Sequence, residues 1–101
     1  MSGSIIVALS RAITAHGKEL NELELREPTV KDVMELGYPY LVHGGGADTA
    51  VELRPQIAGK YAVRLAGIPQ SSVEQLSVPD LQKVQGAVMS FFSESESEPA
   101  T

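Results

Sequence analysis

A strand and a helix meet in residues 22–29, which read ELELREPT. In the first half of this stretch leucines alternate with charged residues, and a period of two is typical of a strand with one buried face. Pro28 and Thr29 then favour the start of a helix, because Thr is a good N-cap and Asp32 follows three positions later. A strand that leads directly into a short helix is therefore the first prediction.

Toward the N-terminus, residues 4–27 predict a β-hairpin. Residues 5–9, IIVAL, are apolar and rich in β-branched side chains, and residues 15–18, AHGK, supply a turn that contains glycine. The return strand changes phase between its first two leucines, which predicts a bulge near Asn21. A two-stranded hairpin is marginal in water by itself, so other elements must cover its leucine face.

Toward the C-terminus, the apolar spacing changes to that of helices, separated by Gly and Pro. Thr49 and Glu52 form a capping-box pattern, whereas Pro55 prefers a first turn, so the second helix starts between residues 50 and 54. Between the first two helices, residues 37–48 predict a glycine-rich loop. The fold class is α+β, an N-terminal β-hairpin packed against three to four helices, which we expect at residues 29–36, 50/54–66, 71–76 and 78–92.

The chain has 101 residues, 13 acidic and 8 basic, which gives a formal net charge of −5. One domain is the default at this length, and we place it at residues 1–92. Residues 93–101, SESESEPAT, hold three of the glutamates and almost nothing that could be buried, so we expect a disordered acidic tail. Without this tail the net charge is −2, so the body is nearly balanced.

The composition argues against several classes of protein. There is no cysteine, which rules out disulfides and thiolate metal sites. The basic residues are dispersed among acids, whereas a nucleic-acid binder needs clustered Lys and Arg. No apolar run approaches the ~20 residues of a membrane span, and the N-terminus lacks the pattern of a signal peptide. We expect a soluble intracellular protein that binds neither nucleic acid nor membrane.

Two short patterns raise the question of catalysis or metal binding. Residues 43–46, HGGG, are like an oxyanion-hole loop of esterases, but the Gly-x-Ser-x-Gly elbow that this mechanism needs is missing. His16 and His43 are the only histidines, and no ligand spacing joins them to carboxylates such as Asp48. We expect no enzyme activity, no metal and no cofactor.

Two apolar segments are better candidates for contact with a partner. Residues 38–42, YPYLV, either pack down as a lid on the core or dock onto another protein. Phe91 and Phe92 point about 100° apart on a helix, so one can face the core while the other is exposed, unless both are covered. The candidate partner-binding residues are Tyr38, Tyr40, Leu41, Val42, Met89 and Phe92.

The chain from Ile5 to Phe92 resembles the Mu-like phage tail assembly chaperone family. The resemblance has two parts, an opening at the end of the hairpin and a series of short motifs in the second half. It is weakest over residues 37–48. The residues that carry it are Leu23 to Thr29 with Asp32, Leu65 to Pro69, Val73, Leu76, Asp80, Leu81, Val88, Phe91 and Phe92.

The resemblance implies a chaperone that works in the host cytoplasm and has no catalytic residues. Its partner would be the tape-measure protein, a long helical rod that aggregates easily and is kept soluble until the tail tube forms around it. The chaperone would then be absent from the finished virion. A longer product, made by a translational frameshift, would bring in the tail tube protein.

Two other functions stay open. The chain could be a minor structural or adaptor protein that remains in the phage tail, or a small metal protein or enzyme that uses His16 or His43. The exposed edges of the predicted hairpin also allow a homo-oligomer.

Overall fold

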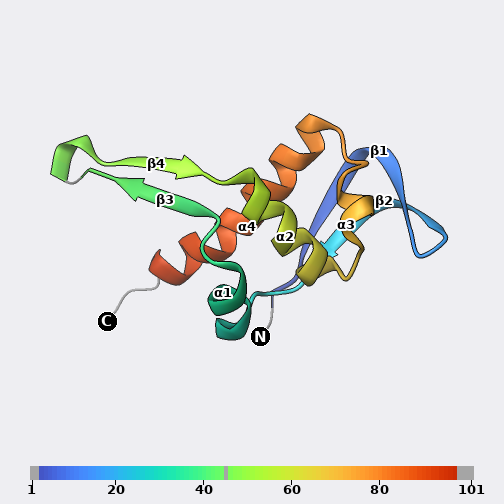
Figure 1. Cartoon of the computed structure of the whole chain (residues 1–101), viewed down its shortest axis with the longest axis horizontal. Coiled ribbons are helices and arrows are strands. Elements are labelled where there is room, and N and C mark those ends of the chain that lie inside the picture. The colour runs from blue at the N-terminus through green and yellow to red at the C-terminus, as the bar shows by residue number, and fades with distance from the viewer. Residues whose placement is uncertain (1–2, 45, 98–101) are drawn as a thin grey trace.

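The computed structural model describes residues 3–44 and 46–97 of the chain. Two antiparallel hairpins lie at opposite ends of a helical body (Figure 1). The α+β fold class is as predicted, with an N-terminal hairpin and four α-helices in the described residues. In chain order the elements are β1 (Ile5–Ala15), β2 (Lys18–Leu25), α1 (Val30–Leu36), β3 (Tyr40–His43), the 3-10 turn η1 (Gly46–Asp48), β4 (Ala50–Leu53), α2 (Pro55–Ala66), α3 (Gln70–Val73) and α4 (Val78–Ser97).

The β1–β2 hairpin confirms the alternation in the sequence. Leu23 and Leu25 are buried, while the charged residues between and beside them are exposed. His16 and Gly17 form the turn, with φ of 53° and 76°. Positive φ at both central residues fits the turn type whose twist matches the strands on either side. The leucine face lies against the helices, as an isolated hairpin requires.

The strand pairing is interrupted where the sequence predicts a bulge. Ala8 pairs with Glu22 and Ile13 with Leu20, so four residues of β1 stand opposite Asn21 alone. The irregularity near Asn21 is therefore confirmed, but the surplus residues belong to β1 rather than to the leucine-rich strand.

This interruption binds a buried carboxylate. The backbone N–H groups of Ser10 and Arg11 donate to Asp80 in the first turn of α4, at 3.0 and 3.2 Å, and the Ser10 hydroxyl adds a third bond at 3.1 Å. These hydrogen bonds, the one from the Ser10 backbone above all, hold the pKa of Asp80 below its ordinary value. The surplus residues of β1 thus attach the hairpin to α4.

The core lies between the leucine face of the hairpin and the helices α2 and α4. On α2, apolar residues at a spacing of four face inward, as predicted, and Gly67 ends this helix in a left-handed conformation. The largest side chains with almost no exposed surface are Tyr61, Ile13, Leu23, Leu25, Val84 and Val88.

Helix α1 is attached to the body by a buried carboxylate, and its apolar Leu36 is partly buried against the core. Thr29 and Asp32 form the predicted N-terminal cap, in which each accepts from the backbone N–H of the other. Asp32 also accepts from Arg26 at 2.8 Å and from Arg64 on α2 at 3.0 Å. The Arg26 guanidinium is the main reason why the pKa of Asp32 lies far below its ordinary value.

The prediction of a loop over residues 37–48 is wrong. Residues 40–43 form β3 and pair with β4, with Tyr40 opposite Leu53 and His43 opposite Ala50. Gly37 ends α1, and Gly44 and Gly46, which have positive φ, lie in the connection between these strands. Each strand is only four residues long, too short for its alternation to stand out beside three glycines.

The start of α2 also corrects the sequence interpretation. Glu52 lies in β4, so Thr49 and Glu52 are not a helix cap, and α2 begins at Pro55. Arg54 is extended because a residue that precedes proline is disfavoured in the helical region. Proline suits the first helical position, where its missing N–H costs nothing.

The last two helices differ from expectation only in their limits. Helix α3 ends at Val73, earlier than predicted. Helix α4 begins as predicted, with the Asp80 N–H donating to the Ser77 hydroxyl at 3.2 Å, but it runs to Ser97. It thus includes part of the predicted tail, of which residues 98–101 lie outside the described residues. Across the described ranges, no helix is long and apolar enough to span a bilayer.

Candidate partner-binding site

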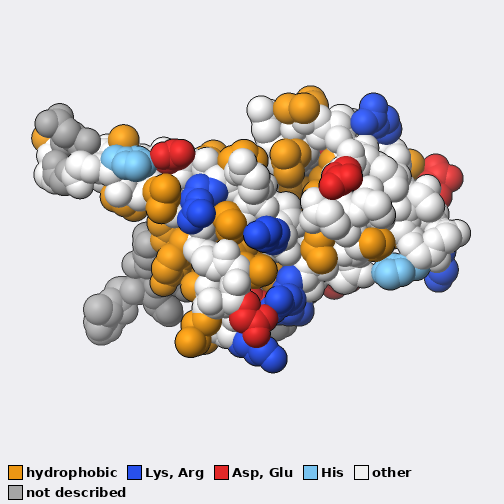
Figure 2. All heavy atoms as spheres, in the orientation of Figure 1, with side chains coloured by type: hydrophobic (Ala, Val, Ile, Leu, Met, Phe, Trp, Pro, Cys, Tyr) orange, Lys and Arg blue, Asp and Glu red, His pale blue; other side chains and the backbone are white. Residues whose placement is uncertain are grey.

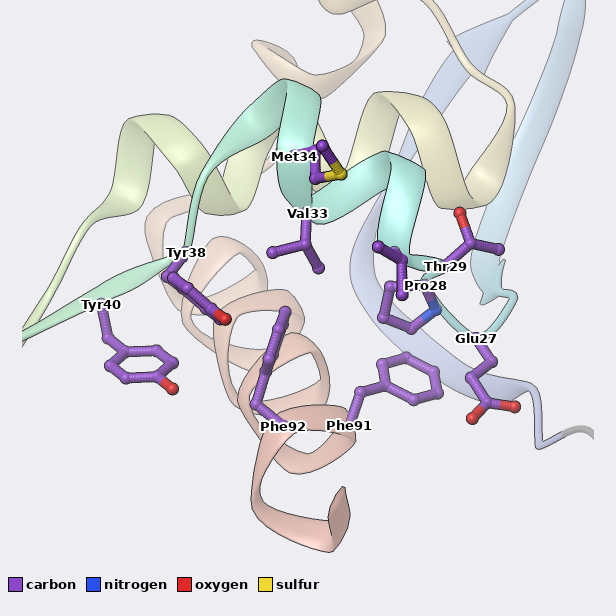
Figure 3. Close-up of a pocket in the computed structure, with 10 residues that line it drawn as sticks. Glu27, Pro28, Thr29, Val33, Met34, Tyr38, Tyr40, Phe91 and Phe92 are labelled. Carbon is purple, nitrogen blue, oxygen red and sulfur yellow. The ribbon is translucent and has the colours of Figure 1, made fainter. Parts of the chain in front are cut away.

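A groove of about 430 Å³ opens between α1, the segment that leads into β3 and the last turns of α4 (Figure 3). The side chains of Val33 and Phe92 point into the space between the two helices. Apart from one glutamate at its end, the groove is lined by uncharged and mostly apolar residues. We call this surface the groove; its residues are Glu27, Pro28, Thr29, Val30, Val33, Met34, Tyr38, Tyr40, Phe91 and Phe92.

Three aromatic rings, those of Tyr38, Tyr40 and Phe92, form one side of the groove, and a fourth, Tyr61, joins them to the core. The Phe92 ring lies edge-on to Tyr38, Tyr40 and Tyr61, with centroids 5.8, 6.0 and 5.8 Å apart. Tyr61 is buried, and its hydroxyl donates to the Gly37 carbonyl at 2.7 Å. Burial raises the pKa of Tyr61 to about 12, so it stays a hydrogen-bond donor at neutral pH. This side of the groove is therefore fixed before any partner arrives.

The α1 side of the groove exposes apolar residues to solvent. The sequence places Val30, Val33 and Met34 on one helical face, and the structure turns this face away from the core. Val30 is 74% exposed and Met34 80%, because Asp32 is the residue that α1 buries. A short helix attached through a carboxylate keeps its apolar face available.

The second hairpin continues the apolar surface beyond the groove. We call residues 40–53 the arm, because this hairpin projects from the body (Figure 1). Cross-strand partners share one side of a sheet, so Tyr40, Val42, Val51 and Leu53 lie together on what we call the arm face. The Tyr40 ring touches Phe92, so the arm face turns toward the groove. Hydrophobic surface is visible along this end of the molecule in Figure 2.

The opposite side of the arm is more polar. Leu41 and Ala50 share it with His43 and Glu52, whose side chains lie 2.7 Å apart. Both members of this pair are more than half exposed, so it contributes little to stability. The arm therefore presents two unlike faces, and only one of them is apolar throughout.

The six residues predicted to contact a partner are only partly brought together. Tyr38, Tyr40 and Phe92 form one aromatic cluster. Val42 belongs to the arm face, whereas Leu41 lies on the other side of the arm. Met89 is half-buried one turn before Phe92 and does not line the groove. Of the six predicted contact residues, three therefore line the groove, one lies on the arm face, and Leu41 and Met89 lie on neither.

Sequence reasoning missed the residues that complete this surface. Leu53 was assigned to the second helix, whose predicted start lay between residues 50 and 54, although the alternation of Val51 and Leu53 with Glu52 matches a strand. Val30 and Met34 share one face of the predicted first helix, which we expect to help cover the leucine face of the hairpin, and the structure exposes both. The buried position of Asp32 could have identified them as exposed, since Val30 and Met34 lie on the other side of α1 from a capping carboxylate that must face the body.

The two histidines lie at different ends of the molecule, one on each hairpin (Figure 2). His16 Nε2 is 3.0 Å from the Gly67 carbonyl oxygen, and His43 pairs with Glu52. No group of three or more potential metal ligands is found in the part of the chain that the structure describes. Of the HGGG tetrapeptide, His43 ends β3, Gly44 follows it with a positive φ, and Gly46 begins η1, whereas Gly45 lies outside the described residues.

Residues 7–93 match the sequence model of a family described as phage tail assembly chaperone proteins, E, or 41 or 14. The chain belongs to this family. The match covers most of the sequence and includes the second hairpin, the groove and all of the first hairpin except Ile5 and Ile6. No curated protein and no solved structure matches the chain. Membership of a chaperone family suggests a non-enzymatic role in which the protein binds another protein of the phage tail.

Proposed function

We propose that this tail assembly chaperone binds the tape-measure protein of its phage in the host cytoplasm, keeps it soluble while the tail is built, and leaves before the virion is complete. The observation that carries the proposal is the continuous apolar surface formed by the groove and the arm face. Family membership narrows the partner to a protein of tail assembly. An exposed apolar surface on an otherwise packed small domain marks an interaction site.

The arrangement suits temporary binding. Phe91 and Phe92 connect the groove to the core, whereas the exposed apolar residues of the surface, Val30, Met34, Val51 and Leu53, lie outside the core and are available to a partner. The fixed aromatic side lowers the cost of ordering the site when a partner binds. A net charge of −5 helps to keep a loaded complex dispersed.

The proposed contact residues revise the prediction from the sequence. Tyr38, Tyr40, Val42 and Phe92 are kept, since the groove and the arm face contain them. Leu41 and Met89 become peripheral. The surface gains four aliphatic residues: Val30, Met34, Val51 and Leu53.

Co-expression tests the proposal. We expect the wild-type chaperone to move the tape-measure protein of the same phage into the soluble fraction, and Met34→Glu to reduce that fraction severalfold. Met34 is exposed, so the substitution should leave the free energy of unfolding within about 0.5 kcal/mol of wild type. Val78→Glu is the control, because Val78 is also apolar and largely exposed (68%) but lies outside the groove.

Two results would count against the proposal. A tape-measure protein that stays insoluble with the wild-type chaperone would contradict the choice of partner. Mass spectrometry that finds the chain in purified virions would favour the alternative, a minor structural or adaptor protein of the tail. Mass spectrometry of infected cells would show whether a longer frameshifted product is made. We propose that this product engages the tail tube protein.

A further inference from the structure

We infer that the groove binds one face of an amphipathic α-helix whose apolar stripe is bordered by Lys or Arg. This inference rests on the proposed function and gives the chemistry of the segment that would be recognised. It depends on three features of the site: the kind of walls that the groove has, the spacing of the side chains on those walls, and the charge at its end.

The walls favour a helix over an extended segment. They consist of side chains from α1 and α4, the turn before α1 and two tyrosines. An extended peptide laid along such walls would bury backbone N–H and C=O groups against apolar atoms, and each group left without a partner costs free energy. A helix satisfies these groups internally and presents only its side chains.

The spacing of the walls fits helix packing. On α1, Val30, Val33 and Met34 follow one another at intervals of three and one, which makes a ridge along one face. On α4, Phe91 and Phe92 supply the facing ridge. Side chains of a third helix at positions i, i+3, i+4 and i+7 can fill the space between two such ridges.

The charge at one end selects the polar border of the partner. Glu27 is the one charged side chain among the described residues that line the groove, and it lies beside Phe91 (Figure 3). It is exposed, and none of the described residues forms an ion pair or hydrogen bond with its carboxylate. An apolar helix bordered by Lys or Arg is complementary to this end, and one bordered by acids is repelled.

Overlapping 20-residue peptides that span the tape-measure protein of the same phage provide the probe. Fluorescence anisotropy measures the binding of each peptide to the full chain. We expect the bound peptides to carry apolar residues at helical spacing with Lys or Arg at the border. Glu27→Lys should weaken their binding about threefold to tenfold, and added salt should shrink that difference. Met34→Glu should abolish the binding of these peptides.

Glu22→Lys is the matched control, because it makes the same change of charge on the exposed face of β2 and should bind like wild type. The inference is overturned if no peptide binds, if the bound peptides show no helical spacing, or if Glu27→Lys and Glu22→Lys bind alike. These outcomes do not bear on the proposed function, which is tested separately by the solubility of the intact tape-measure protein on co-expression.

Discussion

The two hairpins of this chaperone have the same architecture and opposite surroundings. Each is a pair of antiparallel strands joined through residues with positive φ. The β1–β2 hairpin lays Leu23 and Leu25 against α2 and α4, whereas the arm leaves Val51 and Leu53 exposed. Since both are antiparallel hairpins, the difference in burial distinguishes the hairpin that packs on the core from the one that we propose contacts a partner.

The two hairpins are also attached to the body in different ways. The first is fixed by a buried carboxylate, Asp80, that accepts from the backbone of β1. The arm is fixed at its base, where the Arg54 N–H donates to the Pro39 carbonyl at 2.9 Å and Tyr40 packs on Phe92. The arm can therefore be altered along its length without disturbing the core.

A pair of leucine truncations should show this contrast most strongly. Leu25→Ala removes a side chain with 0% exposure and should lower the free energy of unfolding by about 2–4 kcal/mol. Leu53→Ala makes the same change on the arm face, where the side chain is 46% exposed, and should cost less than about 1 kcal/mol. Urea denaturation monitored by circular dichroism measures both.

Solubility of the co-expressed tape-measure protein gives the second half of this comparison. Leu53→Ala should reduce the solubilised fraction although the chaperone itself stays folded. Equal losses of stability in the two variants would show that the arm belongs to the folding core and would break the contrast.

A pair of carboxylate substitutions should show a smaller difference of the same kind. Asp32→Asn removes the charge that binds Arg26 and Arg64 in the body, and should cost about 1.5–3 kcal/mol. Glu52→Gln removes the charge that pairs with His43 on the arm, and should change the free energy of unfolding by less than about 0.5 kcal/mol. Thermal unfolding at pH 7 ranks the two variants.

The pH dependence of stability sharpens this test. The folded pKa of Asp32 lies below its ordinary value of 3.8, so the native state binds fewer protons than the unfolded state. Its contribution is therefore fully present well above pH 3.8 and is lost as the pH falls toward the folded pKa. Asp80 acts in the same direction. Asp32→Asn should flatten the loss of stability below pH 4, and an unchanged curve would contradict the assigned role of Asp32.

The sequence predicted the elements whose patterns are long or have a capping residue. The leucine alternation of β2, the cap formed by Thr29 and Asp32, and the end of α2 at Gly67 are all confirmed. Each depends on neighbours close in the chain, and such signals can be read locally. The attachment of Asp80 to the backbone of β1 joins residues about 70 positions apart, and nothing in the sequence near either one indicates it.

The candidate site was harder to predict for a related reason. The arm consists of two four-residue strands around three consecutive glycines, and glycines favoured a loop when they were considered without the pairing of Tyr40 with Leu53. The groove needs α1 and the end of α4 to lie side by side, which only the packing of the whole chain determines. Aromatic residues near positions 38–42 and 91–92 indicated a contact surface. The sequence did not indicate that Val30, Met34, Val51 and Leu53 belong to the same surface.

Hydrogen exchange of the chaperone alone and in complex with its co-purified tape-measure protein tests the central claim most directly. The account predicts slower exchange of backbone amides in residues 30–42 and 50–53 upon binding, and little change in β1 and β2. Protection confined to the β1–β2 hairpin, with the groove and the arm exchanging as in the unbound protein, would contradict it.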